Sequence, residues 1–193
     1  INKFDVSVLK GPCLAKELAR KIKSSTIVAN KNINIAKSIG DLISTSYYKV
    51  DFSNDVKGVE ICSAIKNIYS MLIGAAEGSN TASSIFTKSI NEMVYLTKYF
   101  KGKEETVYSL AGIGDLYVSA VGGRNSKMGE FLGKGFKFKY AKKKFMSKDT
   151  IEGAELVFEI GKQILKKVNN NKIPLMVDLI KSILKNKKLS IRL

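Results

Sequence analysis

The spacing of hydrophobic residues changes about a quarter of the way along the chain. Over the first fifty residues, short apolar runs alternate with helical patterns, which predicts strands at 5–9, 26–29 and 47–52 and helices at 14–22 and 33–43. Alternation of strands and helices is typical of an α/β domain. Three strands are too few for an independent sheet covered on both faces, so this part is expected to be the end of a larger α/β domain.

Beyond residue 54 the apolar residues recur at three and four positions, the spacing of amphipathic helices. Helices are predicted at 59–76, 79–100, 104–111, 127–132 and 150–168, and from Pro174 onward, with a glycine-punctuated segment at 112–123. Ser79 and Asn80 are suited to cap a helix, and Pro174 is suited to a first helical turn. The predicted fold class is therefore α+β, with a boundary near Asp55 and an all-helical domain over 56–193.

Composition excludes several kinds of chemistry. The 193 residues contain no histidine, which excludes a Ser-His-Asp or Cys-His nucleophile and a His-ligated zinc within the chain. The two cysteines, Cys13 and Cys62, lie far apart and predict neither a metal site nor a redox pair. No segment approaches the roughly 20 apolar residues of a membrane span, and a cytoplasmic protein is expected. A chain that starts at Ile1 and enters a strand almost at once suggests a piece of something longer.

The excess of positive charge is compatible with nucleic-acid binding but does not require it. The chain has 33 Lys and Arg against 17 Asp and Glu, a net charge of +16, but most lysines are spread singly along helical patterns. The densest run, residues 134–148, interleaves seven lysines with aromatic residues that could stack on bases. We favour a solvated loop whose aromatic side chains pack inward, because no nucleic-acid motif accompanies it. Residues 185–192 are expected to form a solvated tail.

Two long windows contain a single charge each. Lys66 is alone in residues 61–76, on a helix that is apolar on nearly all sides. If Lys66 is buried, its pKa should fall toward neutrality and it could exchange a proton near physiological pH; it could instead extend to the surface at the helix edge. Asp115 is alone in residues 106–123, with glycines close before it that allow a tight backbone. It could cap a helix, or it could pair with Lys66 beside a cavity.

The segment that follows, Gly122-Gly123-Arg124-Asn125, leads into a predicted helix. A guanidinium and a carboxamide at a helix N-terminus, behind flexible glycines, suit an anion or phosphate. The alternative is a glycine turn that carries a surface arginine.

Short motifs in a fixed order cover most of the chain. They are VLKGP at 8–12 with AKE at 15–17, DVKGVE at 55–60, IKN at 65–67, EGSNTA at 77–82, NEM at 91–93, LAGIGDL at 110–116, GRN at 123–125, GE at 129–130 with GKG at 133–135, and IEG at 151–153. Together they resemble the NAD(P)-dependent glycerol-3-phosphate dehydrogenases. The resemblance implies that residues 1–55 are the C-terminal part of a Rossmann-type dinucleotide-binding domain and that residues 56–193 form a substrate and dimerisation domain.

The resemblance implies dihydroxyacetone phosphate and sn-glycerol 3-phosphate as substrates, NAD or NADP as cofactor, and a homodimer. Lys66 would exchange the proton on the C2 oxygen of the substrate, and Asp115 would hold and polarise Lys66 or a substrate hydroxyl. Arg124 and Asn125 would bind the phosphate, with Gly123 beside them and Arg124 also near the cofactor.

Further roles follow from the same resemblance. Gly11 and Cys13 would line the substrate side of the first turn, and Ala15 its cofactor side. Thr150 and Glu152 would contact the cofactor from the helical domain, and Asn80 would order the site. The family usually has Thr, Ser or Asn at the position of Cys13, and bacterial members often have Ser at that of Gly123. No GxGxxG turn occurs, so the chain alone is not expected to hold NAD(H) normally.

Two other classes of function stay open at this point. The chain could be a non-catalytic helical module that dimerises through its helical faces, with Lys66 and Asp115 as a structural ion pair. It could also be a basic nucleic-acid-binding domain, whose affinity would fall steeply with salt. If the chain is instead part of a dehydrogenase, as the resemblance implies, neither nucleic acid as a partner nor a membrane span is expected.

Overall fold

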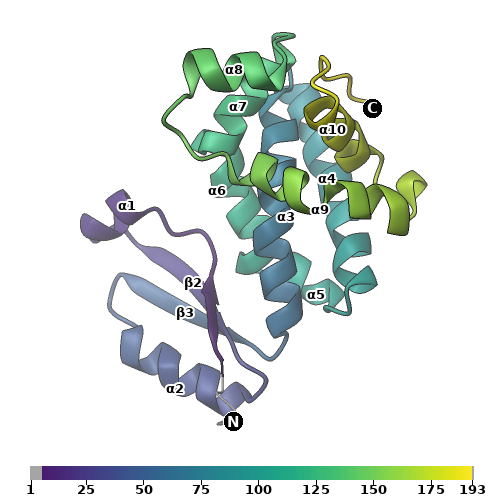
Figure 1. Ribbon diagram of the computed structural model, residues 1–193. Coiled ribbons are helices and arrows are strands. Elements are labelled where there is room, and N and C mark those ends of the chain that lie inside the picture. Colours follow the sequence, from purple (N-terminus) through teal and green to yellow (C-terminus); the bar gives the residue numbers. More distant parts are fainter. Residues whose placement is uncertain (1–5, 193) are drawn as a thin grey trace. The chain divides into compact units, whose positions relative to one another are not determined.

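Strands are confined to the N-terminal part of the chain in the computed structural model, which describes residues 6–192 (Figure 1). The remainder is helical, which confirms the predicted α+β class. Contacts divide the chain into two units: Ile1–Ser63 with Leu96–Asp115, and Ala64–Tyr95 with Leu116–Leu193. The two longest helices, α3 (Val56–Gly74) and α4 (Ser79–Tyr99), contribute residues to both units.

The first unit contains a three-stranded sheet in the order β1-β2-β3. Its elements are β1 (Val8–Lys10), α1 (Ala15–Ala19), β2 (Ser24–Ala29), α2 (Ile33–Ile43) and β3 (Tyr48–Ser53). β2 and β3 are parallel, and α2 supplies the crossover that a parallel pair requires, whereas β1 runs antiparallel to β2. The core of this unit joins strand residues to helix residues: Val8, Ile27, Ala29, Val59 and Ala111, with Val56 and Leu110 against them.

One buried carboxylate joins two helix starts in the first unit. Asp55 is 7% exposed, and its Oδ1 accepts the Gly58 backbone N–H over 3.0 Å at the start of α3. Its Oδ2 accepts the Lys103 backbone N–H and the Thr106 hydroxyl, each over 2.7 Å, at the start of α5 (Glu104–Val107). The carboxylate therefore caps α3 and fixes α5 in one contact set.

The second unit is built from helices. Besides the greater parts of α3 and α4, it contains most of α6 (Asp115–Gly122), then α7 (Arg124–Gly133), α8 (Phe138–Phe145), α9 (Glu152–Lys167), a short 3-10 turn η2 (Asn170–Lys172) and α10 (Pro174–Leu184). α9 and α10 pack closely, because Gly161 of α9 leaves room for Ile180 of α10. Seven of the eleven residues of α10 are buried, so this helix is a central part of the core.

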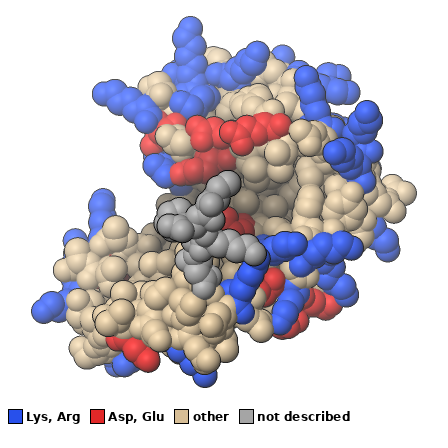
Figure 2. Space-filling view, turned by 60° about the horizontal axis from the view of Figure 1, so that its bottom comes forward, with Lys and Arg blue, Asp and Glu red and all other residues tan. Residues whose placement is uncertain are grey.

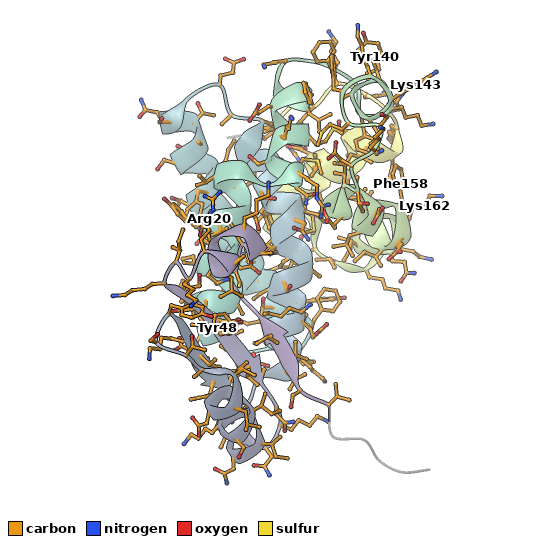
Figure 3. All side chains as sticks on the ribbon, turned by 90° about the vertical axis from the view of Figure 1, so that its left-hand side faces the viewer. Arg20, Tyr48, Tyr140, Lys143, Phe158 and Lys162 are labelled. Atoms are coloured by element: carbon orange, nitrogen blue, oxygen red, sulfur yellow. The ribbon has the colours of Figure 1, made fainter. Side chains whose placement is uncertain are left out.

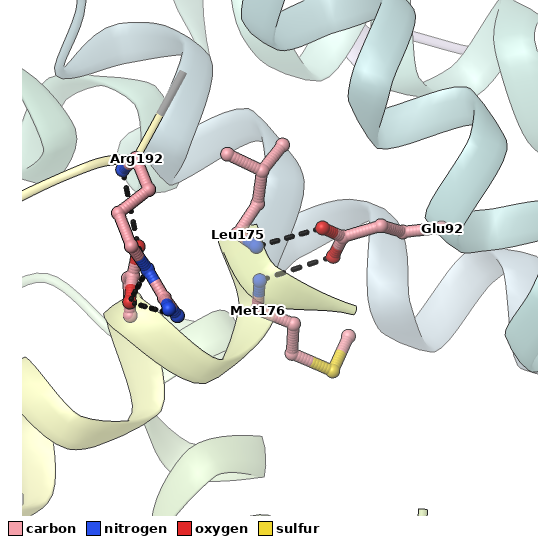
Figure 4. A network of polar contacts seen from close by, with 5 residues as sticks. Glu92, Leu175, Met176 and Arg192 are labelled. Carbon is pink, nitrogen blue, oxygen red and sulfur yellow. Dashed lines mark hydrogen bonds and ion pairs between the residues drawn. The ribbon is translucent and has the colours of Figure 1, made fainter. Parts of the chain in front are cut away.

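A second buried carboxylate holds the N-terminus of α10 (Figure 4). Glu92 of α4 is 4% exposed and accepts the backbone N–H groups of Leu175 (2.7 Å) and Met176 (3.1 Å). The Tyr69 hydroxyl of α3 donates to Glu92 Oε2 over 3.0 Å. Burial raises the pKa of Glu92 to about 7, against the lowering effect of these hydrogen bonds. Midway along the same helix, Asp178 accepts hydrogen bonds from Nε and Nη2 of Arg192.

Several predicted elements need correction. The strand predicted at 5–9 is β1 at Val8–Lys10, and residue 5 lies outside the described residues. The helix predicted at 14–22 ends at Ala19, and Lys21 adopts φ 59°, a left-handed conformation that stops a helix. The glycine-punctuated segment 112–123 contains a π-helix, η1 (Leu110–Gly114), followed directly by α6.

The prediction for residues 134–148 was wrong in two respects. Instead of a loop, the segment contains the helix α8, and not all of its aromatic side chains pack inward. Phe138 is buried, but Tyr140 is 48% and Phe145 38% exposed. Lysine stems are compatible with a helix whose other face is apolar, and burial of Phe138 and Ala141 stabilises it. Figure 2 shows that the Lys and Arg side chains on the face drawn there form several separate groups.

Candidate active site

A cluster of polar side chains joins α3, α7 and the start of α9 within the second unit. Asn125 of α7 is 5% exposed, and its Nδ2 donates to Asn67 Oδ1 (3.3 Å) and to Glu152 Oε2 (3.0 Å). The Gly153 backbone N–H donates to Asn125 Oδ1 over 2.8 Å. Both amide hydrogens of Asn125 are therefore engaged, and the partners fix the orientation of its carboxamide. We call Asn67, Arg124, Asn125, Glu152 and Gly153 the polar cluster.

Arg124 is the exposed member of the polar cluster. Its Nη2 donates to Glu152 Oε1, while the other oxygen of that carboxylate is taken by Asn125. The side chain of Arg124 is 56% exposed and that of Glu152 is 36% exposed. A guanidinium has five N–H donors, so this ion pair orients Arg124 without using its capacity to bind a further anion. Arg124 also begins α7, after an N-cap at Gly123 that makes no side-chain capping bond, and a helix N-terminus favours negative charge.

Close backbone contact fixes α7 against α3. A Cβ atom on Gly129 would overlap the Met71 carbonyl oxygen, and one on Gly133 would overlap that of Ala75. From the other side, a Cβ atom on Gly74 would overlap the Ser126 carbonyl oxygen. Gly129 and Gly133 are one helical turn apart, so they form a smooth edge on α7. These glycines determine where α7 places Arg124 and Asn125 relative to α3.

Lys66 lies on α3 immediately before Asn67 of the polar cluster. Lys66 is half-buried, which is intermediate between the full burial and the extension to the surface that its sequence leaves open. Its neighbours Ile65, Ile68 and Tyr69 are buried. The predicted burial of this helix is confirmed on its apolar side. Lys66 thus combines a half-buried side chain with a sequence neighbour, Asn67, whose side chain is held by α7.

Asp115 belongs to the first unit, whereas Lys66 belongs to the second. Asp115 is 5% exposed and follows the π-helix η1 at the start of α6. The backbone before it is tightly packed, because a Cβ atom on Gly112 would overlap the Val107 carbonyl oxygen. Ser109 caps η1 by accepting the Ala111 N–H over 3.2 Å. The tight backbone expected from the glycines before Asp115 is confirmed at Gly112.

The turn between β1 and α1 carries three of the predicted site residues in the first unit. Gly11 has φ 127°, a conformation that favours glycine, and a Cβ atom there would lie 3.3 Å from Thr26 Cα of β2. Cys13 is a half-exposed free thiol, and Ala15 is exposed at the first position of α1. The turn therefore needs glycine at residue 11.

The structure brings together part of the predicted site. Arg124, Asn125 and Glu152 are in direct contact, and Gly123 precedes them. Thr150 is exposed two residues before Glu152, and Asn80 is exposed at the start of α4. Among residues 6–192, no three Cys, Asp or Glu side chains gather as metal ligands.

Asn67 was not among the predicted site residues. Its contact with Asn125 spans 58 positions in the sequence, and no local pattern reports such a contact. The available signal was its place directly after Lys66, inside the motif IKN.

The fold and the polar cluster define an α+β protein in which a helical unit presents an oriented guanidinium beside a lysine-bearing helix. Residues 55–191 match the family model described as NAD-dependent glycerol-3-phosphate dehydrogenase C-terminus. The chain belongs to this family. Within residues 6–192, no helix has the length and apolar character needed to cross a bilayer.

Similar proteins agree with the family model. The chain is 35% identical over 136 residues to the NADP(+)-dependent glycerol-3-phosphate dehydrogenase of Archaeoglobus fulgidus, covering 66% of this chain and 41% of that protein. It is 31% identical over 166 residues to glycerol-3-phosphate dehydrogenase [NAD(P)+] of Clostridium botulinum strain Alaska E43, covering 82% and 50% respectively. The chain therefore spans about half the length of the curated relatives it matches.

A solved structure has the same fold. The crystal structure of glycerol-3-phosphate dehydrogenase from Coxiella burnetii superposes with a TM-score of 0.84 at 28% identity, covering 94% of this chain and 57% of that one.

Proposed function

We propose that this chain supplies the substrate-binding and proton-transfer part of a dehydrogenase that interconverts dihydroxyacetone phosphate and sn-glycerol 3-phosphate. The observation that carries the proposal is the polar cluster, in which Arg124 is oriented by Glu152 while Asn125 holds the residue next to Lys66. Family membership supports the same substrate class. The arrangement suits a small anionic substrate with a reacting oxygen.

In this proposal Arg124 binds the phosphate of the substrate. Its exposed guanidinium offers N–H donors beyond those used by Glu152, and the N-terminus of α7 adds a favourable field for an anion. Asn125 contributes mainly by positioning, because a direct bond from its amide to phosphate would require giving up the bond to Asn67 or that to Glu152. Gly11, Cys13 and Gly123 are proposed to border the substrate.

Lys66 is proposed to move the proton. When the C2 carbonyl of dihydroxyacetone phosphate is reduced, C2 gains a hydride and its oxygen gains a proton, which the Lys66 ammonium donates; in the reverse direction the neutral amine accepts it. The position of Lys66 on α3, directly before Asn67 of the polar cluster, supports this role. Asp115 is proposed to hold Lys66 or a substrate hydroxyl, and Asn80 to order the site.

A nicotinamide dinucleotide, NAD or NADP, supplies or takes the hydride when bound. The residues present fit a minor part of its binding site. Thr150 offers an exposed hydroxyl and Glu152 a half-exposed carboxylate, groups that can bond the hydroxyls and amide of such a cofactor. Arg124 and Ala15 are the other residues proposed to border it.

Turnover of the protein that carries this chain, with its cofactor, tests the role of Lys66. Lys66→Met should reduce kcat by at least about a hundredfold, the usual contribution of a general acid–base group, with little change in thermal unfolding. Lys88→Met is the matched control, because Lys88 is exposed on α4 and should leave kcat unchanged. Turnover of Lys66→Met equal to that of the unchanged protein would contradict the proposal.

The proposal extends to assembly and compartment. A homodimer is supported by the family resemblance, and two free thiols fit a reducing compartment such as the cytoplasm. Light scattering after gel filtration tests the dimer, and a mass equal to one chain would contradict it.

A further inference from the structure

Helix α8 carries an unusual concentration of positive charge for which the proposed reaction has no use. Residues 134–148 contain seven lysines and no acidic residue. Six of these lysines are exposed, and Lys142 is half-buried. The segment is folded rather than a loose tail, since residues Phe138–Phe145 form a helix whose other face is buried through Phe138 and Ala141. The charges are therefore displayed on a fixed surface.

Residues far away in the sequence add to this surface. The Lys139 backbone N–H donates to Asn186 Oδ1 over 3.2 Å, so the segment after α10 lies against the start of α8. A Cβ atom on Gly135 would lie 3.9 Å from Lys188 Nζ, and Lys187 and Lys188 are exposed. The two densest lysine runs of the chain thus meet in the second unit.

Aromatic rings are built into the same surface. Tyr140 stacks on Phe136 with ring centroids 5.6 Å apart, and Phe145 stacks on Phe131 at 4.5 Å. Lys144 Nζ lies 5.5 Å from the centroid of the Tyr140 ring. Tyr140 nevertheless stays 48% exposed. An ordered aromatic group therefore lies half open to solvent among lysines.

A neighbouring helix extends the exposed aromatic surface. Figure 3 shows Tyr140 and Lys143 of α8 on the same side of the second unit as Phe158 and Lys162 of α9. Phe158 is 49% exposed and contacts Phe138 edge to face, with centroids 5.8 Å apart. Phe158 has the acidic residues Glu155 and Glu159 near it on α9, so the positive charge of this surface is supplied by the lysines of α8 and not by α9. We define the basic aromatic face as Lys137, Lys139, Tyr140, Lys143, Lys144 and Phe158.

We propose that the basic aromatic face docks the protein on an anionic phospholipid membrane. Lysines attract an acidic lipid surface as mobile point charges, and half-exposed Tyr and Phe rings enter the interfacial region. The face fits a membrane better than a nucleic acid on two grounds. The Tyr140 ring already stacks on Phe136 and has Lys144 over it, which limits stacking on a base. No arginine, the residue suited to bidentate phosphate contacts, belongs to the face.

Sedimentation with vesicles tests the proposal on the 193-residue chain. We expect the chain to pellet with phosphatidylcholine vesicles that contain phosphatidylserine, to stay in solution with phosphatidylcholine alone, and to be released by salt. Each lysine near an anionic surface strengthens binding about fivefold. The triple variant Lys137→Gln, Lys139→Gln, Lys143→Gln should therefore weaken binding on the order of a hundredfold.

The matched control removes the same three charges elsewhere. Lys31, Lys37 and Lys49 are exposed lysines of the first unit, and their replacement by Gln should leave most of the vesicle binding intact. Tyr140→Ala should weaken binding with no change in charge. Circular dichroism checks that folding is preserved: each variant should have the same helical signal and melting temperature as the unchanged chain.

Four results would overturn the proposal. The first is that the chain does not pellet with vesicles that contain phosphatidylserine, and the second is that it pellets equally with phosphatidylcholine vesicles alone. The third is an equal loss of vesicle binding in the two triple variants. The fourth is that a single-stranded RNA oligonucleotide binds through the same lysines while vesicles do not bind. Equal loss in the two triple variants would mean that net charge alone drives binding. The RNA result would identify the face as a nucleic-acid surface.

Discussion

Replacing Glu92 by glutamine should remove a pH dependence from the stability of the second unit. Burial raises the pKa of this carboxyl from 4.5 to about 7 in the folded protein. Between these two values the folded state keeps a proton that the unfolded state has released. Folding therefore takes up a proton, and the free energy of unfolding falls as pH rises through this range.

The magnitude follows from the size of the shift. A pKa difference of one unit is worth about 1.4 kcal/mol, so a rise from 4.5 to about 7 corresponds to roughly 3 kcal/mol. This contribution is fully present below pH 4.5 and is lost by the time the pH exceeds about 7. Glutamine carries no titrating group. Across this pH range the free energy of unfolding of Glu92→Gln should therefore fall by roughly 3 kcal/mol less than that of the unchanged chain.

Urea unfolding followed by circular dichroism measures the effect at a series of pH values between about 4 and 8. Glu159→Gln, an exposed carboxyl on α9, is the matched control and should follow the unchanged chain throughout. Stability curves for Glu92→Gln and the unchanged chain that run parallel across this range would refute the reasoning, because they would mean that Glu92 titrates at the same pH in both states.

Three further predictions follow from single contacts. Gly129→Ala should lower the free energy of unfolding by more than about 2 kcal/mol, because its Cβ would overlap the Met71 carbonyl oxygen. Gly78→Ala is the control and should be tolerated, since nothing lies within 4 Å of a Cβ atom there. Urea unfolding compares the two variants, and equal effects would contradict the close packing of α7 on α3. Asp55→Ala should cost about 2–4 kcal/mol by the same measurement, because the side chain caps α3 and binds α5; a loss below about 0.5 kcal/mol would contradict that role. A thiol reagent at mildly alkaline pH should label half-exposed Cys13 and spare Cys62, whose pKa is raised by burial to about 11; rapid labelling of both in the folded chain would be inconsistent with this environment.

Regular elements with strong hydrophobic periodicity could be predicted from the sequence. The helix predicted at 33–43 is α2 residue for residue, and the strands predicted at 26–29 and 47–52 differ from β2 and β3 by one or two residues. α8 was missed because four of its eight residues are lysine and one is tyrosine. The apolar contacts that stabilise this helix come from elements distant in the sequence, such as Phe158 of α9. α6 was missed because glycines on both sides indicate a loop.

The candidate site could be predicted only as individual residues. The single charges at Lys66 and Asp115 and the pair Arg124-Asn125 are visible as departures from a charge-rich composition. The part played by Asn125 was not visible, because its partners lie 58 and 27 residues away. Whether a polar residue faces a ligand or holds its neighbours depends on such distant contacts.

Titration calorimetry with sn-glycerol 3-phosphate tests the proposed substrate site most directly, since it needs no turnover. The unchanged chain should bind glycerol 3-phosphate and not glycerol, and Arg124→Gln should weaken binding at least about tenfold, the loss expected for a charge-assisted contact. Arg192→Gln is the matched control, because Arg192 is also exposed and paired with a carboxylate, and it should bind normally. Equal affinities in the Arg124 and Arg192 variants, or equal binding of glycerol and glycerol 3-phosphate, would contradict the proposed phosphate site.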